Sequence, residues 1–293
     1  AASDVYKRQG ISKLRPICNT VRGVKTGHQF PDSSGFCSYG LVKGRTANVD
    51  FIESHYSALL PGCTPHPPHK HNHEEILIIV KGTAELTVET AVDAGTFKRL
   101  EVRQGDFIIY PRNCLHTIRN SGSEVVTYLM FKWQSRPALP DSGLPPTFVS
   151  GLASENRPEQ AQESKLGMKT LFERPTEYFR KLQSHRTVIA PGGGYAAHAD
   201  AHDVGIILLR GTVETVGETI EAPAFIYYPA GEVHGMRNAG HRDADYLVFE
   251  FHGANRALTS SLYQSAARGL RRPLALARYL RNKARTVARQ SHG

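Results

Sequence analysis

The chain carries one residue pattern twice, and this repeat restricts the folds that are open to it. A proline, a histidine and an asparagine recur with the spacing P-x4-H-x3-N at Pro111–Asn120 and again at Pro229–Asn238, with an offset of 118 residues. Upstream, a Gly–His–Gly series also recurs at Gly62, His69 and Gly82 and at Gly192, His198 and Gly211. Two matches in the same order indicate an internal duplication of one domain.

Both copies contain short β-branched or aromatic segments separated by Gly, Pro and Asn, which is typical of β-strands. In the first copy, the predicted strands are Val49–Leu59, Ile76–Val80, Ala84–Glu89, Lys98–Val102, Phe107–Tyr110 and Val125–Phe131. Strand-like segments resume from Thr187 to Phe251. The offset is 129 at the upstream histidine and 118 downstream, so we expect a longer hairpin near Val88–Lys98 in the first copy. Repeated short strands favour an all-β sandwich or barrel over βαβ units.

The segments outside the two copies have a different character. Residues 135–167 contain five prolines and little periodicity, which predicts a linker outside the core. Tyr178, Phe179 and Leu182 have helical spacing and predict a short helix over Pro175–Gln183. We therefore expect five parts in chain order. They are an N-terminal segment (1–45), the first copy (46–133), a linker with a short helix (134–184), the second copy (185–252) and a helical tail (253–293).

Three features concern the origin and location of the chain. Residues 1–9 (AASDVYKRQ) resemble a translated sequencing-adapter scar, so they are set aside from the fold prediction. The chain has four cysteines, Cys18, Cys37, Cys63 and Cys114. They form no CxxC pair and are too few for a disulfide scaffold. Reduced thiols in a cytoplasmic protein are the expectation. The sequence contains no run of eighteen apolar residues, so we expect no transmembrane helix.

The net charge of +9 comes from the end of the chain. From Arg256 onward there are nine basic residues and no acidic one, so 36 − 9 = 27 basic residues face 27 acidic residues before that point. Such a run is either a solvated helix face or a contact with an acidic surface, lipid head groups or nucleic acid. Only two aromatic residues, Tyr263 and Tyr279, accompany the arginines, so we expect no dedicated nucleic-acid site.

One group of residues in the first copy carries metal chemistry. His69, His71 and Glu75 have the same parity, so in extended chain their side chains share one face, and His116 comes from a later strand. Three imidazoles and one carboxylate suit a divalent first-row metal such as Mn, Fe, Co, Ni or Zn and leave positions for water or substrate. The alternative is an exposed histidine-rich run that binds metal only adventitiously. His66 and His73 are expected at the rim or beside the ligands rather than among them.

These residues form the patterns G-x6-H-x-H-x3-E-x6-G and G-x5-P-x4-H-x3-N, which resemble the two motifs of the cupin superfamily, here duplicated as a bicupin. Gly62 lies one residue further from the first histidine than in the usual motif, and Asn113 stands where the second motif usually has glycine. The resemblance implies a double-stranded β-helix, or jelly roll, in each copy. It also implies that the metal ligands are His69, His71, Glu75 and His116. Cupins are often dimeric, so a homodimer is a further expectation.

The second copy departs from the motif and leaves three interpretations open. Asp200 stands at the position of the second histidine, and Val204 replaces the carboxylate. The favoured interpretation is a degenerate site that now serves packing. A second is a facial triad suited to Fe(II), made of His198, Asp200 and His234 and assisted by His202 and Asp203. The third is a polar pocket that binds a ligand without metal.

The surroundings of the first site indicate the kind of ligand. Four apolar residues are expected near the site, either lining a pocket or forming part of the hydrophobic core of the barrel: Leu77, Ile79, Ile118 and Met130. An apolar pocket with one metal suits a small organic molecule that chelates through oxygen, such as a hydroxy or keto acid or a catechol-like ring. Cys63 and Cys114 are expected to be inert thiols. The resemblance implies dioxygenase, decarboxylase, isomerase or hydrolase activity, or non-enzymatic sugar or effector binding, and it identifies no general acid or base.

The leading hypothesis is a metal-dependent enzyme that acts on a small polar organic substrate, with dioxygenase-like chemistry favoured over isomerase- or hydrolase-like chemistry. Its rival is a non-enzymatic sensor or binding module, in which the metal site recognises a ligand and the tail recruits a partner.

Overall fold

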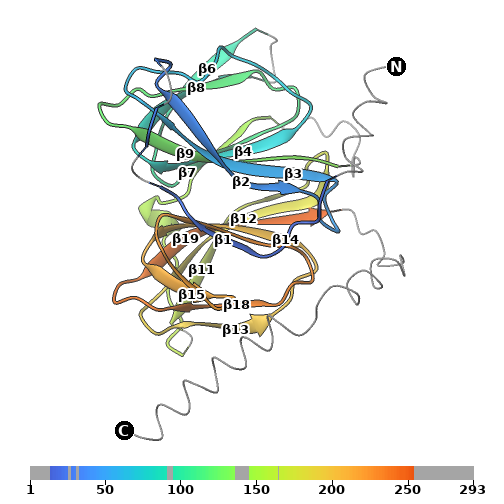
Figure 1. Cartoon of the computed structure of the whole chain (residues 1–293), viewed down its shortest axis with the longest axis vertical. Coiled ribbons are helices and arrows are strands. Elements are labelled where there is room, and N and C mark those ends of the chain that lie inside the picture. Colours follow the sequence, from blue (N-terminus) through green and yellow to red (C-terminus); the bar gives the residue numbers. More distant parts are fainter. Residues whose placement is uncertain are drawn as a thin grey trace, which may run out of the picture.

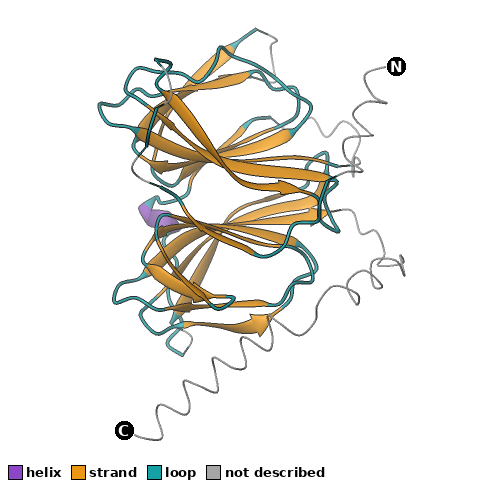
Figure 2. Ribbon diagram, in the orientation of Figure 1, coloured by secondary structure: helices purple, strands orange, loops and turns teal. Residues whose placement is uncertain are grey.

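The computed structural model of this 293-residue chain describes residues 14–25, 28–30, 33–90, 95–135, 145–163 and 165–253. Within these ranges the secondary structure is β-strand except for one 3-10 helix, η1 (Ser154–Asn156) (Figure 2). Residues 1–9 and the predicted helical tail beyond residue 253 lie outside the described residues. None of the helical structure among the described residues has the length and apolar character needed to cross a membrane.

The first copy is a sandwich of two antiparallel sheets. Its large sheet has the strand order β10-β7-β4-β9-β3-β2, and its small sheet has the order β6-β5-β8. The strands are β2 (Phe36–Gly44), β3 (Phe51–Leu59), β4 (Glu74–Lys81), β5 (Thr83–Glu89), β6 (Phe97–Arg103), β7 (Asp106–Tyr110), β8 (His116–Arg119), β9 (Val126–Gln134) and β10 (Thr147–Ser150). Leu77 and Ile79 from β4, Leu86 from β5 and Ile118 from β8 are buried together between the two sheets. This confirms the predicted all-β jelly roll.

The second copy repeats this architecture. Its large sheet has the order β1-β17-β14-β19-β12-β11 and its small sheet the order β13-β18-β15-β16. The strands are β1 (Thr20–Gly23), β11 (Leu166–Arg174), β12 (Phe179–Ile189), β13 (Gly194–His198), β14 (Asp203–Arg210), β15 (Thr212–Thr215), β16 (Glu218–Glu221), β17 (Ala224–Tyr228), β18 (His234–Asn238) and β19 (Ala244–Gly253). The hairpin of β5 and β6 has strands of seven residues, whereas β15 and β16 have four each. The longer hairpin expected in the first copy is thereby confirmed.

The two large sheets face each other in the middle of the molecule (Figure 1). A single apolar cluster spans both, and it includes Phe131 and Trp133 from β9 and Phe249 and Phe251 from β19. The rings of Phe131 and Phe251 lie 5.4 Å apart, and those of Trp133 and Phe251 lie 5.5 Å apart. Each large sheet is therefore buried on both faces, which explains why Ile76–Val80 is a continuous apolar run rather than an alternating one.

The chain exchanges two edge strands between the copies. β1 precedes the first copy in sequence but pairs with β17 of the second copy, from Thr20 opposite Tyr227 to Gly23 opposite Ala224. β10 precedes the second copy but pairs with β7 of the first. Each large sheet is thus completed by a strand that belongs, in sequence order, to the other copy, so the two jelly rolls are joined by backbone hydrogen bonds as well as by apolar contact.

The predicted helix over Pro175–Gln183 is wrong. This segment instead runs into β12, and Phe179 and Leu182 both point into the cluster between the sheets. A β-bulge between Phe179 and Lys181 inserts one extra residue, so two residues three apart face the same side of a strand. That spacing imitates the helical period, which is why the pattern was misleading.

The prediction that residues 135–167 lie outside the core is also wrong in part. Thr147–Ser150 forms β10, and Val149 and Leu152 pack against the cluster between the sheets. Gly105 and Gly151 allow this close approach, because a Cβ atom at Gly151 would lie 2.4 Å from the carbonyl oxygen of Gly105.

Buried carboxylates also join the copies. Glu74 accepts hydrogen bonds from Trp133 Nε1 at 2.8 Å, Thr176 Oγ1 at 2.7 Å and the Glu177 backbone N–H at 2.9 Å. Burial raises the pKa of this carboxyl, although the three donors partly offset the effect.

Asp203 makes the corresponding link from the second copy. Its carboxylate accepts hydrogen bonds from Thr46 Oγ1 at 2.7 Å and from the Ala230 backbone N–H at 2.8 Å. Burial raises the pKa of Asp203 to about 6 despite these donors. Asp203 therefore belongs to the contact between the copies rather than to an assisting position beside His198 and His234.

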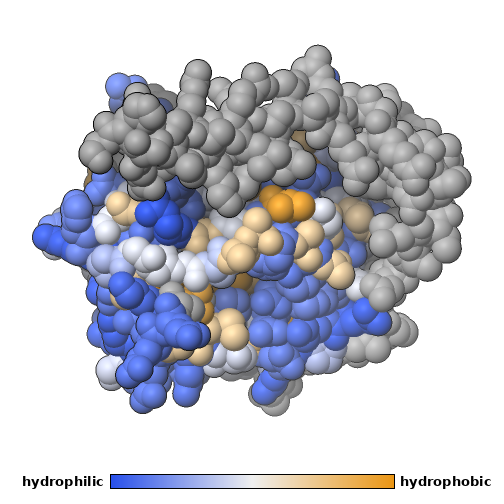
Figure 3. All heavy atoms as spheres, turned by 90° about the horizontal axis from the view of Figure 1, so that it is seen from below, coloured by the Kyte–Doolittle hydropathy of each residue, from blue (hydrophilic) through white to orange (hydrophobic). Residues whose placement is uncertain are grey.

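The end of the molecule formed by the second copy is mostly hydrophilic, with apolar residues gathered across its middle (Figure 3). The exposed apolar side chains of this copy include Val216 and Val233. The visible part of this face that the structure describes thus has the mixed character of a solvated surface rather than of a large apolar contact.

Candidate metal centre

Backbone pairing brings two of the predicted ligands together. The backbone N–H of His69 donates to the His116 carbonyl at 3.1 Å, and that of His116 donates to the His69 carbonyl at 3.0 Å. The Asn113 N–H donates to the His71 carbonyl at 2.7 Å. Asn113 has a φ of 59°, a left-handed conformation that asparagine tolerates better than most residues other than glycine. The departure from the usual glycine at this position therefore keeps the turn that holds His71.

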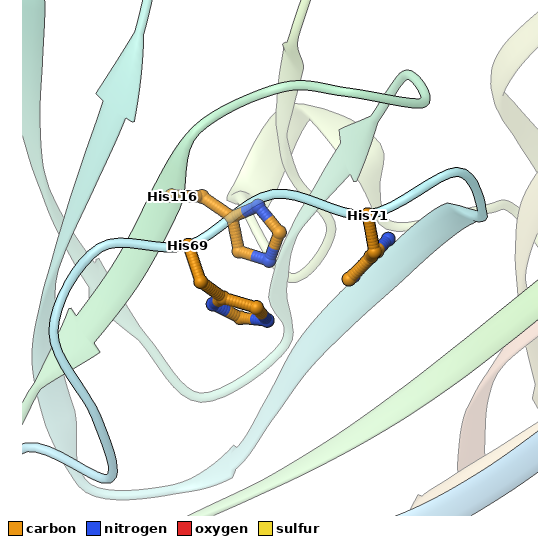
Figure 4. A group of neighbouring side chains, drawn as sticks. All are labelled: His69, His71 and His116. Atoms are coloured by element: carbon orange, nitrogen blue, oxygen red, sulfur yellow. The ribbon is translucent and has the colours of Figure 1, made fainter.

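The three imidazoles converge at one end of the barrel interior. One ring nitrogen from each of His69, His71 and His116 lies within 4.8 Å of the others. The ring centroids of His69 and His116 are 4.8 Å apart, and those of His71 and His116 are 5.3 Å apart (Figure 4). The spacing suits three nitrogen ligands around one ion.

Glu75, the second residue of β4, lies beside this group of histidines. Its Oε2 atom lies 3.0 Å from His71 Nε2, and its Oε1 atom lies 3.8 Å from His116 Nε2. Burial alone would raise the pKa of Glu75, but the hydrogen bond with His71 and the charges of His116 and Lys132 lower it below its ordinary value. The buried carboxylate is thus held in its ionised form, which is the form that binds metal.

Contacts on the far side of the His116 and His71 rings orient these two histidines. His116 Nδ1 lies 2.9 Å from the Cys114 carbonyl, and the ring of Tyr110 stacks on His116 at 4.2 Å. His71 Nδ1 lies 3.1 Å from the His73 carbonyl. Such contacts fix the ring and leave Nε2 for the centre, as is usual for metal-ligating histidines.

The state of His69 also fits a cation. Burial, with smaller effects from the neighbouring histidines, lowers the pKa of His69 to about 4, so its imidazole is neutral near pH 7. Its Nδ1 atom is buried and has no hydrogen-bond partner among the described residues. Imidazole nitrogens beside a carboxylate are donors that a divalent first-row ion takes, so the residues present fit such an ion.

The residues expected around the centre occupy distinct places. Four apolar side chains are buried in the first copy, namely Leu77, Ile79, Ile118 and Met130. His66 is exposed, and its ring lies 4.0 Å from that of His69. The ring of His73 lies 5.5 Å from that of His71 and 5.1 Å from that of Phe51. None of the four cysteines is in a disulfide, and burial raises the pKa of Cys114 to about 12, so this thiol is unreactive.

Sequence reasoning missed three side chains near the centre. Lys132 lies directly across the sheet from Glu75, and its Nζ atom is 3.9 Å from Glu75 Oε2. His55 lies across from Met130, and Tyr110 stacks on His116. Met130 and Lys132 are two residues apart on one strand, so extending the alternation from Met130 would have identified Lys132.

The second copy keeps the arrangement of two histidines. His198, Asp200 and His234 each offer an atom within 4.8 Å of the others. His234 Nε2 lies 3.3 Å from Asp200 Oδ2, and Tyr228 stacks on the His234 ring at 4.0 Å, as Tyr110 does on His116. His198 is exposed, whereas Val204 is part of the apolar core.

Comparison with known proteins agrees with this fold. Residues 55–132 match the family model of the cupin domain. No curated protein sequence matches the chain. The family match in the first copy and the likenesses below support the cupin superfamily, and the likenesses agree with the jelly-roll fold of the chain.

Three solved structures illustrate the likeness. A putative glyoxylate-induced protein from Pseudomonas aeruginosa has a TM-score of 0.61 at 13% identity, covering 85% of this chain and 95% of that one. AerE from Microcystis aeruginosa has a TM-score of 0.57 at 15% identity, with 80% and 97% covered. Oxalate decarboxylase from Bacillus subtilis has a TM-score of 0.56 at 14% identity, with 89% and 86% covered.

Proposed function

We propose that the first copy holds one divalent first-row metal ion through His69, His71, Glu75 and His116, and that the chain is a metal-dependent enzyme for a small polar organic substrate. The observation that carries this proposal is the convergence of three imidazoles, two of which, His71 and His116, also lie beside the buried carboxylate of Glu75. A bound ion of this kind supplies Lewis-acid polarisation of a chelating oxygen or, as iron, reactivity with O2.

The position of Lys132 favours a substrate that carries a carboxylate. Its ammonium group lies 3.9 Å from Glu75, and its side chain is 17% exposed. When Glu75 serves as a metal ligand, much of its charge is engaged by the ion, and Lys132 is then available to pair with a substrate carboxylate. The similar Bacillus subtilis protein is an oxalate decarboxylase with Mn(II) centres, and this likeness also favours a small carboxylic acid.

The residues at the centre are compatible with several reaction classes. The described side chains at the centre offer a cation for an anionic substrate and an apolar wall that limits water. Dioxygenation, isomerisation and hydrolysis are all compatible with such a site, and dioxygenation is the first to test. The rival function is a non-enzymatic sensor, favoured by the exposed position of His66 beside His69, which leaves the rim open to solvent.

Elemental analysis of the purified full chain tests the metal proposal. His71→Ala should contain about one equivalent of divalent metal less than the wild-type protein, because the first copy then loses its ion. A change in a direct ligand should weaken binding by more than the roughly 10–100-fold typical of a second-layer change. His241→Ala, which alters an exposed histidine of the second copy, is the control and should keep the metal. Full metal content in His71→Ala would overturn the ligand assignment.

Oxygen uptake and ligand binding then separate enzyme from sensor. The metal-loaded chain is incubated with a panel of small hydroxy, keto and dicarboxylic acids while O2 and products are measured. O2 consumption supports a dioxygenase, and product formation without O2 supports a decarboxylase, isomerase or hydrolase. Saturable binding of one acid with no turnover supports the sensor and would overturn the enzyme proposal. Lys132→Gln should weaken binding of the acid while keeping the metal.

A further inference from the structure

The second copy contains another group of side chains that can bind a metal, in addition to His198, Asp200 and His234. It consists of His202, just before β14, and of Glu250 and His252 on β19, and one ligand atom of each lies within 4.8 Å of the others. Glu250 Oε2 lies 2.8 Å from His252 Nε2 and 3.3 Å from His202 Nε2.

The sheet register shows how this group arose from the duplicated pattern. In the first copy Glu75 on β4 lies across from Lys132 on β9, and in the second copy Val204 on β14 lies across from Glu250 on β19. The offset of 118 residues relates Lys132 to Glu250, as it relates His116 to His234. The second copy therefore carries its carboxylate on the neighbouring strand, where the first copy has a cation.

The same comparison between the copies applies to the histidines beside Glu250. His252 occupies the position of Gln134 in the first copy, again with an offset of 118, so a ligand-type side chain stands where the first copy has an amide. The rings of His202 and His252 stack at 3.9 Å, and both approach the same oxygen of Glu250. Two positions on β19 thus acquire metal-binding side chains just where Val204 removes the usual carboxylate.

Glu250 is held in place from its other oxygen. His185 Nε2 lies 3.4 Å from Glu250 Oε1, and His185 Nδ1 lies 2.9 Å from Thr187 Oγ1. Hydrogen bonds of this kind orient metal-binding carboxylates and histidines. The side chains of His202, Glu250 and His252 are 18%, 17% and 22% exposed, so the group is largely shielded from water but open to a small ion.

We propose that the second copy binds a divalent transition-metal ion of the zinc type through His202, Glu250 and His252. Two imidazoles and one carboxylate are a ligand set that Zn²⁺ uses with a fourth position left for water or an added ligand. His185 acts as a positioning residue for Glu250. The second copy is then a relocated metal site rather than a degenerate one, and this inference stands whether or not the first copy is catalytic.

Zinc titration of the full-length chain, freed of metal with a chelator, tests the proposal. The titration is made on the wild-type chain and on a His69→Ala/His71→Ala chain, so that the second copy is counted separately. We expect about one equivalent of Zn²⁺ in the latter. Glu250→Gln keeps the side-chain volume and should weaken this binding by more than about 100-fold, beyond a second-layer effect. Zn²⁺ should raise the melting temperature of the parent and not that of Glu250→Gln.

Two further variants separate this site from the cupin position. His252→Gln restores the residue that the first copy has and should also abolish the equivalent, while Asp200→Ala should retain it. Loss of zinc in Asp200→Ala with retention in Glu250→Gln and His252→Gln would overturn the proposal in favour of the facial triad. Binding that never saturates near one equivalent would overturn it in favour of a metal-free polar network.

Discussion

Removing one partner from the buried pair of Arg186 and Asp245 should be costly, because the other charge is then left buried without its partner. Arg186 Nε donates to Asp245 Oδ1 at 3.0 Å and Nη2 donates to Oδ2 at 2.7 Å, while the two side chains are only 5% and 2% exposed. Arg186 also donates to the Ala153 carbonyl at 3.3 Å and so ties the linker to β12. Asp245→Ala leaves the guanidinium buried without its carboxylate, which should cost about 3–5 kcal/mol.

Urea unfolding followed by tryptophan fluorescence measures this cost. Trp133 is the single tryptophan and is fully buried between the copies, so its emission reports on their separation. The control is Glu214→Ala, which removes the partner of Arg237 in an ion pair whose side chains are 45% and 59% exposed, and which should cost less than about 1 kcal/mol.

The double variant Arg186→Met/Asp245→Leu separates the loss of a pair from the burial of an unpaired charge. Replacing both partners with apolar side chains should recover most of the stability lost in Asp245→Ala, because no charge is then left unpaired. The reasoning is refuted if Asp245→Ala costs no more than Glu214→Ala, or if the double variant is less stable than Asp245→Ala.

Three other outcomes are expected. Tyr110→Phe keeps the ring that stacks on His116 and should bind metal nearly as wild type, whereas Tyr110→Ala should weaken binding about 10–100-fold; equal metal affinity in the two variants would contradict an orienting role. Asp203 has a folded-state pKa of about 6, above its ordinary 3.8, so its contribution is fully present below pH 3.8 and is lost as the pH rises through about 6. The metal-free wild-type chain should therefore lose about 2 kcal/mol relative to Asp203→Asn between pH 4 and pH 7 in urea titrations, and parallel pH profiles would refute this. Deleting residues 257–293 removes eight basic residues and no acidic one, changing the net charge from +9 to +1, and should weaken binding to heparin while metal content is retained; release of metal would show that the deleted segment supports the site.

Local patterns identified most strands of the two copies and the side chains that converge in the first copy, but they did not identify β1, β2, β10 or β11. The spacing of His69, His71 and Glu75 and the repeated spacing around His116 identified these side chains, although His69 and His71 lie in the segment before β4 and not on a strand whose alternation would align them. The structure brings these imidazoles together, and their role as ligands stays a prediction until metal is measured.

Other features were misread because they depend on what packs against a segment. The spacing of Phe179 and Leu182 imitates a helix because a β-bulge shifts one residue, and a bulge is decided by the partner strand rather than by local preference. The proline-rich linker was placed outside the core although β10 completes a sheet. Local strand propensity does not show that the edge of β7 is left unpaired by its own copy and can accept β10.

The sequence by itself therefore determined that this protein contains two related β-domains and which side chains of each carry the repeated motif, because both follow from periodicity and from fixed offsets along the chain. Only the tertiary structure decided that β1 and β10 are exchanged between the copies and that Glu250 lies across from Val204. Cross-strand neighbours are set by sheet register, which joins residues more than forty positions apart, and no local pattern encodes that distance.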